Sequence, residues 1–102
     1  MEAYIIDGYR SAVTKAKRGG FKNFRSDDLS VIVIKHLLNK FPEIELDRIN
    51  DVIVGCANPE GEQGLQVGRL ISARALGTGV PGMTINRYCA SGLEAISLAV
   101  SK

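Results

Sequence analysis

The sequence lacks the residues on which several protein classes depend. Its 102 residues include no tryptophan, three prolines, two cysteines (Cys56 and Cys89) and one histidine, His36. Two cysteines exclude a disulfide scaffold and a zinc site built from four cysteines. A single histidine leaves almost nothing for a metal site built from imidazoles. We therefore expect neither a bound metal nor a disulfide-stabilised fold.

Long apolar runs are also absent. No stretch approaches the roughly 18 residues of a membrane span, and Glu2 and Asp7 flank the short apolar run near the N-terminus, unlike a signal or transit peptide. With 45% hydrophobic and 24% charged residues and a net charge of +2, the chain is too apolar and too nearly neutral to be disordered. We expect one soluble globular unit in the reducing cytoplasm, without a membrane span.

Charge is distributed unevenly along the chain. Residues 1–25 carry six basic and two acidic side chains, whereas residues 26–62 carry eight acidic and three basic ones. All six of these bases fall in residues 10–25, a Gly- and Lys-rich segment that we call the basic loop. A basic loop can grip phosphate, nucleic acid or an acidic partner, although a solvated loop is the commoner role. Nucleic-acid binding is disfavoured because only Phe21 and Phe24 interleave with the bases.

The order of apolar segments predicts three strand–helix units. The expected strands are residues 3–7, 51–56 and 82–88, and the expected helices are residues 26–41, 65–76 and a last one that runs to about residue 102. Three such units in succession predict an α/β layered fold, β-α-β-α-β-α, with a mixed, mostly parallel sheet.

Capping and breaking residues set the expected helix ends. Ser26 looks like an N-cap, followed by Asp27 and Asp28 in the first turn, and Pro42 stops that helix. The helix is apolar nearly all round, so we expect it to be deeply buried. Gly77 is the expected left-handed stop of the next helix.

Cys89 lies between the third strand and the last helix. Unpaired N–H groups and the helix dipole favour negative charge at such a position, and the thiolate is the nucleophilic form of cysteine. A free amide there can also donate to a developing oxyanion, and the small residues 90–92 allow a substrate to approach. Cys89 is thus a candidate nucleophile, with a buried structural cysteine as the alternative.

Three other residues receive structural interpretations. Cys56 ends a strand between small residues and is expected to pack in the core. His36 falls in mid-helix and is expected to be a core or interface residue, not a base. Gly68 lies inside a helix, where we expect close packing against another helix to be the reason for it.

Residues 86–96, which read NRYCASGLEAI, closely resemble the acyl-enzyme signature of the thiolases. Further segments fall in the family's order and spacing: Arg10 with Lys15, Pro59–Gly64 leading to Arg69, and Val80-Pro81-Gly82 before the signature strand. The similarity covers the whole chain. It implies a thiolase-like fold in which residues 1–102 are the N-terminal portion of the N-terminal domain, with the remaining thiolase domains absent.

The resemblance also implies a reaction. Cys89 attacks the 3-keto carbonyl of a 3-ketoacyl-CoA, acetyl-CoA is released, and the acyl group passes to free CoA. Acyl-CoA and CoA are then the substrates, no other cofactor is expected, and the assembly is a homodimer or homotetramer. A degradative role in fatty acid β-oxidation is favoured, with acetoacetyl-CoA thiolase and a non-catalytic thiolase-like assembly module as alternatives.

The resemblance also indicates what the sequence does not contain. The family's activating histidine, its second acid–base cysteine and its Gly-rich C-terminal loop have no counterpart in residues 1–102. We therefore expect the isolated chain to be inactive, because Cys89 lacks its general base and the remaining oxyanion donors.

Overall fold

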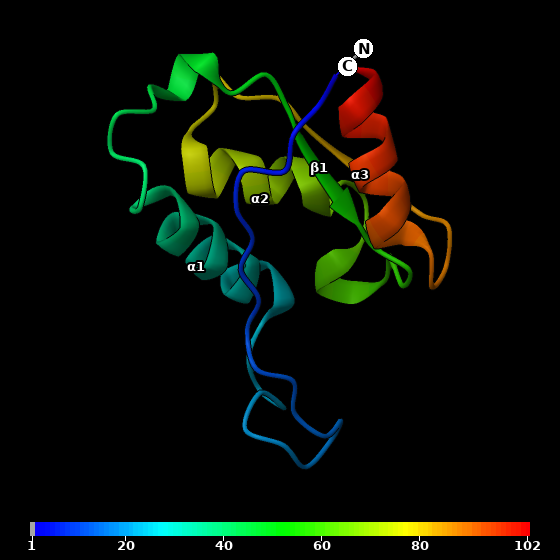
Figure 1. Cartoon of the computed structure of the whole chain (residues 1–102). Coiled ribbons are helices and arrows are strands. Elements are labelled where there is room, and N and C mark those ends of the chain that lie inside the picture. Colours follow the sequence, from blue (N-terminus) through cyan, green and yellow to red (C-terminus); the bar gives the residue numbers. More distant parts are fainter. Residues whose placement is uncertain (1) are drawn as a thin grey trace.

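A computed structural model of the chain describes residues 2–102. Its elements, in chain order, are α1 (Ser26–Leu38), the 3₁₀ turn η1 (Leu46–Arg48), β1 (Val52–Gly55), the 3₁₀ turn η2 (Gly61–Gln63), α2 (Val67–Leu76), β2 (Gly82–Ile85) and α3 (Ser91–Ser101) (Figure 1). Among residues 2–102, α1 is the longest helix with 13 residues, and none has the length and hydropathy that crossing a membrane requires.

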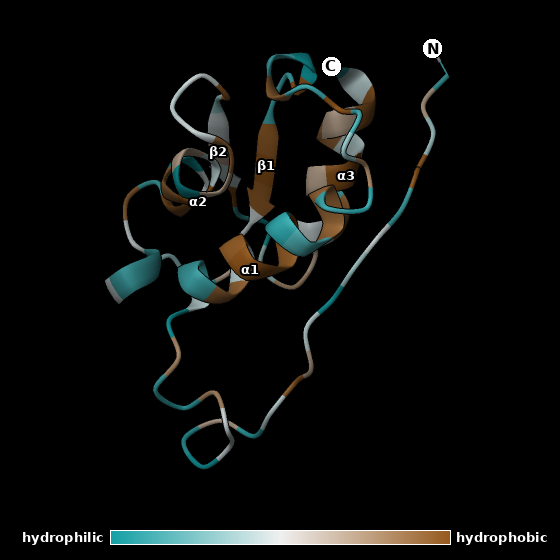
Figure 2. Cartoon of the chain, turned by 90° about the vertical axis from the view of Figure 1, so that its left-hand side faces the viewer, coloured by the Kyte–Doolittle hydropathy of each residue, from teal (hydrophilic) through white to brown (hydrophobic). Residues whose placement is uncertain are grey.

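The two strands form a parallel sheet. Val52 lies opposite Gly82 and Gly55 opposite Ile85, and the Cys56 N–H extends the ladder by donating to the Ile85 carbonyl at 2.9 Å. The strands lie between α2 and α3 (Figure 2). A parallel sheet covered by helices is the α/β layered arrangement that the sequence predicts.

Helix α2 packs closely on β2 through glycine. The Gly68 N–H donates to the Thr84 Oγ1 at 2.8 Å, and a Cβ added at Gly68 would overlap the Met83 carbonyl. On the strand side, a Cβ added at Gly82 would lie 2.5 Å from the Gly68 carbonyl oxygen. Close packing therefore accounts for Gly68, as predicted, although its partner is a strand and not another helix.

A small apolar core joins α1, α2 and β1. Cys56, Val67 and Ile71 are its buried members, and Ile34 and Val54 pack against them. Cys56 thus has the packing role predicted for it. Gly77, directly after α2, has a positive φ of 91° but an extended ψ of 173°, so it ends the helix without the left-handed helical conformation that we expected.

Helix α1 differs from its prediction at both ends and in burial. It begins at Ser26 with Arg25 as the N-cap residue, and no side chain caps it. It ends at Leu38 and not at residue 41, because the amides of Lys40 and Phe41 already bond three residues back as the chain approaches Pro42. The prediction of deep burial is wrong: α1 packs mainly along α2, so its other side, including Ile32, is exposed.

Residues 3–7 do not form the strand expected of them. Tyr4, Ile5 and Ile6 are 76%, 81% and 77% exposed, and the segment runs along the body as an extended chain (Figure 2). Two contacts attach the end of this segment to α1 and to the residues that follow α1. Asp7 forms an ion pair of 2.9 Å with Lys40, and the Tyr9 ring packs edge-on against His36 at 4.5 Å between ring centroids. A strand requires a ladder partner, and within residues 2–102 this segment has none.

A buried carboxylate joins α1 to α2. Asp27 is 1% exposed, and it accepts from Arg25 Nε at 3.0 Å and from Arg74 Nη1 of α2 at 2.9 Å. Arg74 also pairs with Asp28. The hydrogen bond from Arg25 holds the pKa of Asp27 below its usual value, against the opposing effect of burial. The acidic first turn predicted from the sequence is therefore an inter-helix contact.

Candidate active site around Cys89

Cys89 lies on the turn between β2 and α3. The expected strand over residues 82–88 ends at Ile85, because the chain turns sharply before the cysteine: Tyr88 has a φ of 51°, in the left-handed region that residues with a side chain rarely adopt. Cys89 is a free and exposed cysteine. The sequence prediction of a cysteine between a strand and a helix is confirmed.

Two side chains hold this turn in place. The Asn86 Oδ1 accepts from the Tyr88 N–H at 2.8 Å. The Ser91 Oγ accepts from the Arg87 N–H at 2.8 Å and donates to the Tyr88 carbonyl at 2.7 Å, and Ser91 is buried. We expected Ser91 only to be small enough to admit a substrate. Instead its hydroxyl fixes the backbone on both sides of the strained residue.

The first turn of α3 leaves two amides available. The N–H groups of Ala90 and Ser91 bond back to the carbonyls of Arg87 and Tyr88, and the Glu94 N–H bonds to the Ala90 carbonyl. Within residues 2–102, the N–H groups of Gly92 and Leu93 have no backbone acceptor. They come three and four residues after Cys89, at the positive end of an 11-residue helix. Free main-chain donors at the start of a helix can stabilise negative charge on a nearby sulfur or oxygen.

Gly55 sets the position of this helix end on the sheet. A Cβ added at Gly55, the last residue of β1, would lie 2.6 Å from the Ser91 carbonyl carbon. Helix α3 therefore begins directly against the carboxyl end of β1. The carboxyl ends of parallel strands are the usual place for ligand binding in α/β sheets. Neither Gly55 nor Ser91 was predicted as a positioning residue. The only feature of the sequence that could have indicated this role is the small size of both residues where a strand ends and a helix begins.

The other candidate residues lie apart from this turn. Cys56 is buried in the core. His36 is exposed and packs edge-on against Tyr9, so the expectation of a core histidine is wrong, and that of an interface residue stays a prediction. Arg69 braces the loop after α2, donating to the carbonyls of Val80 at 2.7 Å and Thr78 at 3.1 Å. Among residues 2–102, no three or more His, Cys, Asp or Glu side chains are grouped to hold a metal ion.

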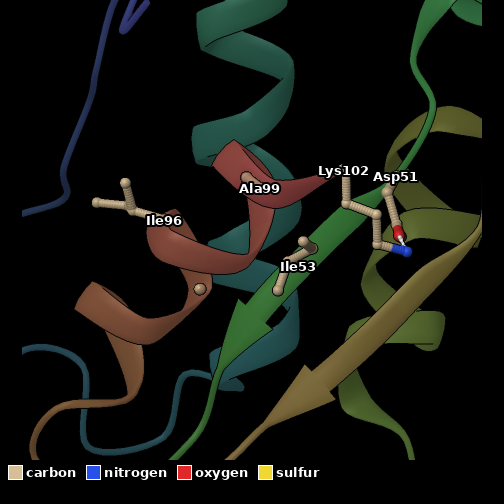
Figure 3. A pocket seen from close by; sticks show the side chains of 6 residues that line it. Asp51, Ile53, Ile96, Ala99 and Lys102 are labelled. Atoms are coloured by element: carbon tan, nitrogen blue, oxygen red, sulfur yellow. Dashed lines mark ion pairs between the residues drawn. The ribbon is translucent and has the colours of Figure 1, made fainter. Parts of the chain in front are cut away.

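A hollow beside β1 is separate from Cys89. It is lined by Ile53 of β1, by Ala95, Ile96 and Ala99 of α3, and by Asp51 and Lys102 (Figure 3). The Lys102 Nζ pairs with Asp51 at 2.9 Å and joins the start of β1 to the end of α3. Because Cys89 precedes the start of α3, this hollow lies at the other end of that helix.

Comparison with known proteins identifies the relationship. The sequence matches the family described as "Thiolase, N-terminal domain" over residues 3–102. It is 47% identical over 102 residues to a 3-ketoacyl-CoA thiolase of Bacillus subtilis, covering 99% of this chain and 26% of that protein. It is 41% identical to a 3-oxoadipyl-CoA/3-oxo-5,6-dehydrosuberyl-CoA thiolase of Escherichia coli, over 96% of this chain and 24% of that protein. It is 38% identical to a 3-ketoacyl-CoA thiolase of Acinetobacter baumannii, over 99% of this chain and 26% of that protein. The chain thus spans about a quarter of the length of these relatives.

Proposed function

The chain belongs to the thiolase family, and from this premise we propose that it supplies the nucleophile of a 3-ketoacyl-CoA thiolase, Cys89. The observation that carries the proposal is the turn at residues 86–91, which presents an exposed thiol just before α3, a helix whose first turn has two amides without backbone acceptors within residues 2–102. Two of the relatives named above are 3-ketoacyl-CoA thiolases, which supports this substrate class.

The proposed reaction has two halves. The Cys89 thiolate adds to the 3-keto carbonyl of a 3-ketoacyl-CoA, and collapse of the adduct breaks the carbon–carbon bond between C2 and C3. Acetyl-CoA leaves with the electron pair of that bond and takes up a proton. The acyl group stays on Cys89 as a thioester until the thiolate of free CoA attacks it, which releases acyl-CoA and restores Cys89. No further cofactor enters this scheme.

The amides of Gly92 and Leu93 suit the charged stages of this scheme. Fixed N–H donors at a helix end stabilise negative charge on the sulfur before attack and on the substrate oxygen in the tetrahedral adduct. Ser91 and Asn86 hold the backbone just before Cys89 by accepting from the Arg87 and Tyr88 N–H groups, which supports a fixed position for the thiol at the start of α3.

We propose that the 102 residues alone do not complete the reaction. Thiolate formation requires a base, and the one histidine of the sequence, His36, packs edge-on against Tyr9. In the working enzyme we place a base from another part of the polypeptide beside Cys89.

The exposed apolar side chains of α3 support a homodimeric or homotetrameric assembly. We assign the enzyme to cytoplasmic fatty acid β-oxidation.

A chimera tests the proposal. The 102 residues replace the matching segment of the Bacillus subtilis relative, and thiolysis of a 3-ketoacyl-CoA is measured. We expect activity in the chimera, its loss on Cys89→Ala and near-complete loss on Cys89→Ser, since a hydroxyl is not ionised at neutral pH. Cys56→Ala is the matched control and should keep most of the activity. Thiolysis that survives Cys89→Ala would overturn the proposal, and thiolysis by the isolated chain would overturn the need for a further base.

A further inference from the structure

Five side chains of the basic loop carry uncompensated positive charge. Within residues 2–102, none of them takes part in an ion pair, and no acidic residue falls between Asp7 and Asp27. These side chains are Arg10, Lys15, Lys17, Arg18 and Lys22, all of them exposed. The sixth base, Arg25, is neutralised by Asp27. The function proposed above makes no use of this concentration of charge.

The basic loop is built of successive hydrogen-bonded turns. The Gly19 N–H donates to the Lys15 carbonyl at 2.7 Å, and the Lys22 N–H donates to the Gly19 carbonyl at 3.1 Å. Lys17 adopts a positive φ of 67° between them, and the rings of Phe21 and Phe24 pack 5.8 Å apart. The bases are therefore displayed on a folded segment, which reduces the entropy lost when they engage a ligand.

The basic loop extends from the end of the molecule where Cys89 lies. Figure 1 shows β1 pointing toward the lower side of the molecule, where β2 runs into the turn before α3 and where the blue loop projects. The acidic segment 43–47, which includes the first two residues of η1, lies at the upper side. Near the base of the loop, Glu62 approaches Ser26, whose N–H donates to its carboxylate at 3.3 Å. The unpaired positive charge is thus placed on the side of the candidate active site.

We propose that the basic loop captures the phosphate groups of the coenzyme A thioester and brings the substrate to the Cys89 end of the sheet. This inference rests on the proposed function. The nucleotide end of coenzyme A carries a 3′-phosphate and a diphosphate, and Lys and Arg side chains bind phosphate oxygens through charge-assisted hydrogen bonds. Unpaired charge in a projecting loop attracts such anions over about 8 Å at physiological salt, and over a longer range at lower salt.

Equilibrium dialysis tests this inference without requiring catalysis. The probe is S-methyl-CoA, a thioether that cannot acylate Cys89, and it is compared with S-methyl-pantetheine, which has no phosphate. Two matched double variants each lose one lysine and one arginine: Lys17→Gln/Arg18→Gln in the loop and Lys35→Gln/Arg48→Gln outside it. Both control residues are exposed and unpaired within residues 2–102. Dialysis is valid whether or not the chain associates.

We expect wild-type chain to bind S-methyl-CoA more tightly than S-methyl-pantetheine, with affinity falling between about 20 and about 200 mM salt. The loop variant should lose at least about fivefold in affinity at low salt, and the control variant less than about twofold. Equal losses in the two variants, or equal binding of the two probes, would overturn the inference. If the chain binds a DNA duplex but not S-methyl-CoA, the inference is overturned, and the basic loop is instead a nucleic-acid binding segment. The proposed function is tested separately: thiolysis by the chimera that carries Cys89→Ala would contradict it, whatever the dialysis shows.

Discussion

Gly55 and Ser91 are in direct contact across the junction of β1 and α3, with no room for a side chain at Gly55. This contact places the start of α3, and with it Cys89, against the carboxyl end of the sheet. It involves two small residues that are 36 positions apart in sequence, so only the folded chain reveals it.

Gly55→Ala should therefore displace the start of α3. We expect a loss of about 1–3 kcal/mol in the free energy of unfolding, because the added methyl group overlaps backbone atoms that have no freedom to move aside. Gly79→Ala is the matched control, since a Cβ at Gly79 meets nothing within 4 Å. Denaturant titration of both variants measures the difference. Equal stability of the two would contradict the contact.

Asp27 should make stability depend on pH in the acid range. Its pKa is lower in the folded chain than in the unfolded chain, because Arg25 donates to the ionised carboxylate. Its stabilising contribution is therefore complete above the unfolded value of about 4 and is lost as the pH falls through the lower, folded value.

Asp27→Asn should remove that dependence and lower the melting temperature at neutral pH by about 5 °C. Asp47→Asn, at an exposed position without an ion pair within residues 2–102, is the control and should change little. Melting curves from about pH 3 to 7 decide the matter. A parallel loss of stability in acid for wild type and Asp27→Asn would assign the effect to other groups.

The sequence predicted the fold where local pattern and burial agree. Helix α2, both observed strands and the strand–Cys89–helix junction were found, because each combines an apolar run with a clear breaker. Residues 3–7 have the composition of a strand, but a ladder partner is a property of the folded chain. The all-round apolar pattern of α1 likewise could not show that only one side would be covered. The roles of Ser91 and Gly55 depend on contacts that no local pattern encodes.

The two cysteines should differ in reactivity in the folded chain. Cys89 is exposed and Cys56 is buried in the core. Iodoacetamide at neutral pH should modify Cys89 at least about tenfold faster, because access controls alkylation. Peptide mapping after short labelling gives the ratio, and labelling in denaturant should bring it close to unity. Faster modification of Cys56 under native conditions would contradict the packing described here.

The outer side of α3 should drive association of the 102-residue chain. Leu93 is 73% exposed, and Ile96 and Val100 are exposed on the same helix. We expect the protein to be associated or poorly soluble, because exposed apolar patches of this kind promote association with other molecules or aggregation. Ile96→Glu should shift the chain toward monomer in size-exclusion chromatography with light scattering, whereas the neighbouring Ser97→Glu should shift it less. A monodisperse wild-type monomer would be inconsistent with this expectation.

The most direct test of the account is the acyl group on Cys89. The chimera with the Bacillus subtilis relative is mixed with a 3-ketoacyl-CoA in the absence of free CoA, quenched in acid and digested, and the peptides are weighed by mass spectrometry. We predict that the peptide containing Cys89 gains the mass of the shortened acyl group, that added CoA removes it, and that Cys56→Ala leaves it unchanged. An active chimera whose acyl group is found on another residue would contradict the assignment of Cys89 as the nucleophile.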